Sequence, residues 1–145
     1  MTARILYLAA FAGYLFSFAL PGLRMGSGSM NGWDSAMILV STLGYWNGPL
    51  NYAVKVFLNL SNGLTLLVFP LHFATGLRSL RWLQTLALVS ASYWIGSAAY
   101  GRMQFQGFGA GFWLWYACLW GMCLCTWAAG KRGRARPAPG TGREG

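Results

Sequence analysis

Four long apolar segments, separated by short stretches that hold nearly all of the charge, constrain this chain more than any other feature. The segments cover residues 5–22, 50–71, 83–101 and 111–129. Each has about the 20 residues that an α-helix needs to cross a hydrocarbon core roughly 30 Å thick. In hydrocarbon the backbone polar groups must bond to one another, as they do within a helix. The pattern therefore predicts an all-α fold, an integral membrane four-helix bundle formed by residues 1–129.

Composition favours lipid as the surrounding solvent. Hydrophobic residues make up 56% of the chain and charged residues 9%, whereas about 25% of the residues of a soluble domain are charged. The only acidic residues are Asp34 and Glu144, so the chain lacks a carboxylate pair placed for acid–base catalysis. No arrangement of a nucleophile and a base is recognisable either. We therefore expect a protein that is not an enzyme.

A further apolar stretch, residues 33–46, lies between the first and second predicted helices and is too short to cross a membrane. It is predicted to form a short interfacial helix with Trp33, Tyr45 and Trp46 at headgroup depth. Asp34 stands near its start, where a carboxylate favours the positive end of the helix dipole. The Gly/Ser-rich residues 24–30 predict a turn, and residues 102–111 predict an outer loop.

The basic residues fall mostly on one side of the predicted membrane. That side holds Arg4, Arg78, Arg81 and the end of the chain, and the opposite side holds Arg24, Asp34 and Arg102. The positive-inside rule then places both termini in the cytoplasm, in agreement with an even number of spans. A cleaved signal peptide is the alternative for the first segment, because Ser17-Phe18-Ala19 has the small-x-small form of a cleavage site.

The second predicted helix carries a polar stripe. Asn51, Lys55, Asn59 and Asn62 follow one another at spacings of four, four and three, which places them on one face of a helix. Polar groups in a spanning helix either hydrogen-bond to neighbouring helices or mark the path of an ion or substrate. Structural hydrogen bonding is the preferred interpretation, and a small transporter or ion-conducting subunit is the alternative.

Sulfur-containing side chains recur on the last predicted helix. Cys118, Met122 and Cys125 are spaced by four and three, and thiolate with thioether suits Cu(I). His72, expected to emerge at the inner end of the second helix, would lie at a similar depth as a fourth ligand. Alternatively, His72 is an axial haem ligand if another subunit supplies the second one. Packing is the preferred interpretation, and we expect no cofactor.

The predicted tail, residues 130–145, is rich in Pro, Gly and Arg and is expected to be disordered. Its basic residues Lys131, Arg132, Arg134 and Arg136 are expected to bind anionic lipid headgroups, or else only to enforce the topology. This cluster is too small to indicate a nucleic-acid partner.

Small residues four apart predict close packing of two helices. Ala9, Gly13 and Ser17 form such a ridge on the first helix, and Ser92 with Gly96 forms one on the third. Ridges of this kind let helix backbones approach closely in lipid.

The order of three short motifs resembles a group of small four-helix inner-membrane proteins of bacteria to which no activity is assigned. The motifs are Leu20-Pro21, Gly32-Trp33-Asp34 and Gly111-Phe112-Trp113-Leu114-Trp115. The resemblance implies the four-helix topology and location in the cytoplasmic membrane. The preferred function is a non-enzymatic accessory or structural subunit that packs with lipids and with other membrane subunits or itself. The transporter, and a haem- or copper-binding subunit, remain the alternatives.

Overall fold

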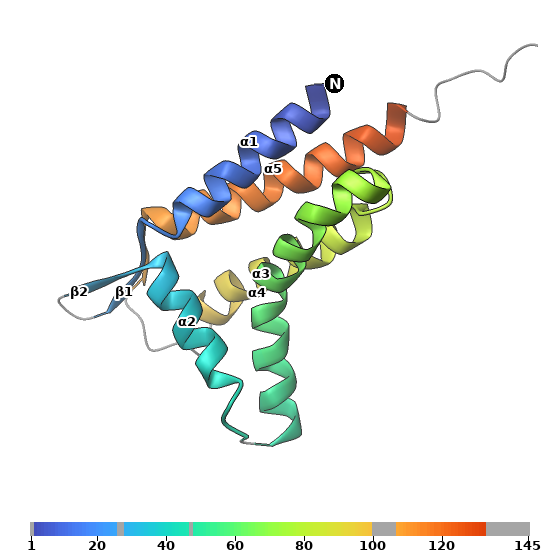
Figure 1. Ribbon diagram of the computed structural model, residues 1–145. Coiled ribbons are helices and arrows are strands. Elements are labelled where there is room, and N and C mark those ends of the chain that lie inside the picture. Colours follow the sequence, from blue (N-terminus) through green and yellow to red (C-terminus); the bar gives the residue numbers. More distant parts are fainter. Residues whose placement is uncertain (1, 26–27, 47, 100–106, 133–145) are drawn as a thin grey trace, which may run out of the picture.

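The computed structural model describes residues 2–25, 28–46, 48–99 and 107–132, and this part of the chain is mostly helical with a small three-stranded sheet (Figure 1). The elements in order are α1 Thr2–Ser17, β1 Pro21–Met25, β2 Gly28–Asn31, α2 Gly32–Thr42, α3 Pro49–Thr75, α4 Arg81–Ala99, β3 Gly107–Phe108 and α5 Ala110–Arg132. The helical class is confirmed, but the expectation of an all-α fold is wrong because of the sheet.

Four helices form the bundle. α1 packs along α5, α3 packs along α4, and α4 also contacts α5. In Figure 1, α1 and α5 lie side by side and run in opposite directions, so the amino terminus lies near the end of α5. Side chains spaced by four and three residues face the interior, as expected for helices that each bury one face. On α3 these are Ser61, Thr65, Val68 and His72.

Three predicted boundaries are corrected. The first segment, 5–22, is α-helical only to Ser17. Residues 18–20 form a tighter turn in which each N–H donates to the carbonyl three residues back. The helix cannot continue at Pro21, because proline lacks the N–H that a helix needs. The interfacial segment 33–46 is a helix, α2, that ends at Thr42. The last helix reaches Arg132, so the predicted disordered tail is helical in its first three residues. Residues 133–145 lie outside the described part.

Strands occupy most of the segment predicted as a turn, residues 24–30, of which residues 26–27 lie outside the described part. β1 and β2 form an antiparallel hairpin with Arg24 opposite Ser29, and β3 pairs with the other edge of β1, with Leu23 opposite Phe108. β3 comes from the segment predicted as the outer loop 102–111, of which residues 102–106 lie outside the described part. Pairing between segments so far apart in the sequence depends on tertiary contacts, which explains why local composition indicated only turns.

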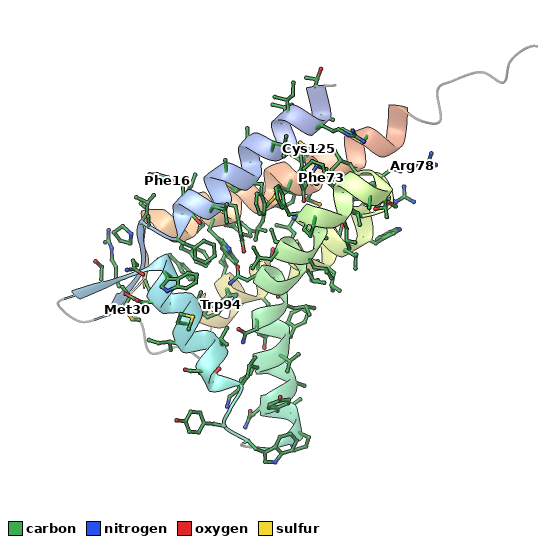
Figure 2. The ribbon with its side chains drawn as sticks, viewed as in Figure 1. Phe16, Met30, Phe73, Arg78, Trp94 and Cys125 are labelled. Carbon is green, nitrogen blue, oxygen red and sulfur yellow. The ribbon has the colours of Figure 1, made fainter. Side chains whose placement is uncertain are left out.

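The surface of the bundle is apolar and its interior is partly polar. Exposed large apolar side chains occur on every helix, among them Ile5, Phe16, Leu66, Val89, Trp120 and Leu124. Figure 2 shows Phe16 pointing away from the bundle on α1. Buried polar side chains include Ser61, Thr65, His72, Gln84, Ser90 and Thr126. Most buried side chains are apolar, as in a soluble domain, so the unusual feature is the number of large apolar side chains that lie exposed.

By length and apolar character, one helical stretch in the described chain clearly meets the requirement for a membrane span, Ala110–Ala129. A second meets it if the two parts of α3, Pro49–Phe57 and Asn59–Thr75, which are bent by 41° relative to each other, form one span. Helix α1 is apolar but shorter.

Candidate functional site

Three sequence motifs that lie far apart along the chain meet at one end of the bundle. We call this region the cap, comprising residues 17–25, 28–36 and 107–112. The Gly32 N–H donates to the Leu20 carbonyl at 2.9 Å, and the Trp33 N–H donates to the Phe18 carbonyl at 3.1 Å. The Gly109 N–H donates to the Gly22 carbonyl at 2.8 Å. The end of α1 is thereby joined through its backbone to the starts of α2 and α5.

Two glycines make this close approach possible. A Cβ atom on Gly32 would lie 2.8 Å from the Cα of Phe18, and one on Gly111 would lie 2.8 Å from the carbonyl oxygens of both Ser17 and Leu20. Backbone atoms cannot yield at such distances as a flexible side chain does. Packing against the segment that holds the Leu20-Pro21 motif therefore explains why Gly32 and Gly111 are glycines.

A cavity of about 70 Å³ lies beneath the cap. Its lining includes Gly22, Gly32, Asn62, Trp94, Gly111 and Trp115. A volume of this size holds a few water molecules, whereas pockets for drug-sized ligands have about 300–1,000 Å³. The cavity therefore suits water or a small group and not a large substrate.

Asn62 links three helices beside this cavity. Its Oδ1 atom accepts a hydrogen bond from the Tyr14 hydroxyl at 3.0 Å and another from the Trp115 indole N–H at 2.9 Å. Tyr14 belongs to α1, Asn62 to α3 and Trp115 to α5. Two donors on one oxygen orient the carboxamide and satisfy both aromatic donors in the interior, where an unpaired polar group is costly.

The rest of the predicted stripe has separate contacts. Lys55 Nζ donates to the carbonyls of Thr42 at 3.3 Å and Tyr45 at 3.0 Å, at the carboxyl end of α2. Asn59 Nδ2 donates to the Lys55 carbonyl one turn back on its own helix, and Asn51 is exposed. Lys55, Asn59 and Asn62 therefore have different hydrogen-bond partners.

The predicted sulfur ligands are likewise spread out. Cys118 lies against Gly13 of α1, Met122 is fully buried, and Cys125 is half-buried. Cys118 and Cys125 are about 10 Å apart along the helix axis at 1.5 Å per residue, too far to share one ion. In the described ranges, no group of three or more His, Cys, Asp or Glu residues is placed to hold a metal ion.

Buried polar side chains at the opposite end of the bundle were missed by the sequence reasoning. His72, expected to emerge at the end of its helix, is 1% exposed, with Nδ1 2.5 Å from the Phe69 carbonyl and its ring centroid 5.1 Å from that of Tyr7. The Tyr7 hydroxyl and the Gln84 amide are buried without a hydrogen-bond partner in the described part. The only sequence signal that could have indicated burial of Gln84 is its place, at helical spacing, on the inward-facing side of its helix.

The remaining expectations have mixed outcomes. Gly13 and Ser17 do face α5, whereas Ala9 of the same ridge is exposed. Ser92 contacts the Tyr116 hydroxyl at 2.9 Å, but no neighbouring atom lies near Gly96.

Asp34 lies in the first turn of α2 as predicted, and Asn31 caps that helix by accepting from the Asp34 N–H at 2.7 Å. Of the predicted headgroup ligands, Lys131 and Arg132 lie in the last turn of α5, and Arg134 and Arg136 lie beyond residue 132.

Comparison of the chain with protein-family models, curated proteins and solved structures gives no match.

Proposed function

We propose that this protein is a multi-pass membrane protein in which α1, α3, α4 and α5 each cross the bilayer, and that it serves as a non-enzymatic accessory subunit. The observation that carries the proposal is the number of large apolar side chains that lie exposed on the helices. Large apolar side chains are exposed around the helices, while serine, threonine, histidine and glutamine side chains are buried between them. A surface of this kind is stable against lipid, whereas in water an exposed apolar area so extensive promotes association.

Helix lengths bear on this proposal. At 1.5 Å per residue, the 23 residues of α5 and the 19 of α4 extend about 34 Å and 28 Å. The 16 residues of α1 extend about 24 Å, and the turn from Phe18 to Leu20 adds to that length. Bilayers thin locally around short spans at a modest cost, so the lengths of these three helices are compatible with a core roughly 30 Å thick.

The distribution of charge favours a single orientation. Arg4 near the start of α1, the α3–α4 turn with Arg78 and Arg81, and the end of α5 lie at the same end of the bundle (Figure 1). By the positive-inside rule this end faces the cytoplasm, together with both termini.

Two observations favour an accessory role over transport. Asn62 holds two donors from neighbouring helices and Lys55 binds the end of α2, so each has a structural partner. The cavity beside Asn62 is about 70 Å³, which is too small for most solutes. The exposed helix faces are then available to lipids and to other membrane subunits.

Membrane insertion and topology are tested first. Extraction of membranes with alkaline carbonate should leave the chain in the pellet, and reporters fused after Arg78 and at the carboxyl terminus should both report a cytoplasmic location. A chain released by carbonate, or reporters on opposite sides, would refute the membrane proposal.

The accessory role is tested by crosslinking in membranes, followed by purification in mild detergent. A defined complex with other membrane proteins is expected. A monodisperse, uncrosslinked chain that carries an ion across liposomes would instead favour the transport alternative.

A further inference from the structure

The turn between α3 and α4 carries two arginines beside an open hollow. The hollow, of about 370 Å³, is lined by Thr75, Arg78, Ser79, Arg81 and Trp82. Figure 2 shows Arg78 at the margin of the molecule, pointing away from the helices. No acidic residue lies in the lining, and the one acidic residue in the described part, Asp34, lies at the start of α2. The hollow is therefore suited to an anion.

The guanidinium group of Arg81 is held in place by aromatic rings. Its Cζ atom lies 5.6 Å from the ring centroid of Trp82 and 5.1 Å from that of Trp127, within the range of cation–π attraction. The Trp127 indole N–H donates to the Thr85 hydroxyl at 3.0 Å, which orients this ring. A guanidinium fixed in this way loses less conformational freedom when it binds an anion, and its fork of donors matches phosphate oxygens.

The hydroxyl groups in the hollow are already used. Thr75 Oγ1 donates to the Leu71 carbonyl at 3.0 Å, and Ser79 Oγ is 3.0 Å from the Thr75 carbonyl and 2.9 Å from that of Gly76. Arg78 and Arg81 are therefore the donors available to an anion at this turn.

An apolar track leads away from the hollow along α4. Trp82, Leu86 and Val89 are spaced by four and three residues on one helix face and are exposed by 63%, 40% and 53%. A ligand that fits both features has an anionic phosphate group and a long hydrocarbon chain. Basic pockets at the cytoplasmic ends of spanning helices bind lipids of this kind.

We infer that the α3–α4 turn is a binding site for an anionic phospholipid. Arg78 and Arg81 hold the headgroup phosphate, and one acyl chain lies along Trp82, Leu86 and Val89. The inference rests on the proposed insertion in the membrane. It differs from the expectation for the basic tail, because this site is a defined pair of arginines on folded elements.

The test measures lipid binding to delipidated protein in detergent by native mass spectrometry, with dioleoyl phosphatidylglycerol and dioleoyl phosphatidylcholine as probes. The protein should prefer phosphatidylglycerol, and the double variant Arg78→Gln, Arg81→Gln should weaken that binding by about 10- to 30-fold, since each basic residue near the headgroups contributes about fivefold. The control, Arg24→Gln, removes a positive charge from β1, at the opposite end of the bundle, and should weaken that binding by less than twofold.

A second variant distinguishes loss of lipid binding from altered membrane insertion. Arg78→Lys with Arg81→Lys keeps the charge that sets topology but removes the planar fork, so it should remain in the membrane and still lose several-fold in affinity for phosphatidylglycerol. Equal losses in the control, equal binding of both lipids, or binding of soluble glycerol 3-phosphate as tight as that of the lipid would overturn the lipid site. Carbonate extraction of the same membranes tests insertion separately, so failure of the proposed function is distinguishable from failure of this site.

Discussion

Replacement of Asn62 by leucine removes the acceptor that joins α1, α3 and α5, and we expect it to lower the free energy of unfolding by about 1–3 kcal/mol. Hydrogen bonds between helices in membranes average about 0.6 kcal/mol and reach about 1.7 kcal/mol, and Asn62 accepts two of them. The matched control is Thr65→Val on the same buried face of α3. The Thr65 hydroxyl donates only within its own helix, to the Ser61 carbonyl at 2.7 Å, so its removal should cost less than 0.5 kcal/mol by the same scale.

A second substitution turns this prediction into a double-mutant cycle. In the native background Tyr14→Phe removes one of the two bonds and should cost about 0.6 kcal/mol. In the Asn62→Leu background the Tyr14 hydroxyl has already lost this acceptor, so its removal should be neutral or stabilising, because an unsatisfied buried hydroxyl is itself unfavourable.

The chain supplies its own reporter for the assay. Cys118 and Cys123 are buried, so a fluorogenic maleimide reacts with them as the protein unfolds in a titration of mixed micelles with sodium dodecyl sulfate. Equal costs for Tyr14→Phe in the two backgrounds would refute the reasoning, because that result means no coupling between Tyr14 and Asn62.

Two further predictions use the same assay, and a third uses limited proteolysis. Gly111→Ala should destabilise the protein by about 1–3 kcal/mol, because its Cβ would lie 2.8 Å from two backbone oxygens. The control is Gly63→Ala, where an added Cβ would have no neighbouring atom within 4 Å, and it should stabilise the protein by up to about 1 kcal/mol. Equal effects of the two substitutions would contradict the packing of the cap. Gln84→Met should stabilise the protein by about 1 kcal/mol, because both polar atoms of that amide are buried without a partner in the described part. Leu88→Met is the control. A loss of stability in Gln84→Met would show that the amide does have a partner. Lys55→Met should release the carboxyl end of α2 and make residues 42–46 more sensitive to limited proteolysis, and unchanged cleavage would count against this contact.

The helices could be predicted from the sequence because their signal is local. Runs of apolar residues of sufficient length gave the positions of α1, α3, α4 and α5 to within a few residues, and proline explains where α1 gives way to β1. The sheet could not be predicted in this way. Its strands are short and glycine-rich, and Leu23 of β1 pairs with Phe108 of β3 across about 85 residues of sequence, so no local pattern distinguishes them from turns.

The sequence predicted which polar residues lie on the second predicted helix, but it did not predict how they are arranged in space. Spacings of four, four and three place Asn51, Lys55, Asn59 and Asn62 on one face of a straight helix, but α3 bends by 41° between Phe57 and Asn59. The first two residues therefore lie on a different part of the helix from Asn62. Burial of His72 and Gln84 was likewise inaccessible, because periodicity identifies a face and does not identify what that face meets.

The pairing of β1 with β3 has a consequence for biogenesis. Leu23 is available soon after synthesis begins, but its partner Phe108 emerges only with the last helix. The β1 edge at the end of α1 therefore lacks its partner strand until the start of α5 is synthesised. A ribosome that stalls before residue 107 would leave a nascent chain in which β1 is paired on one edge only.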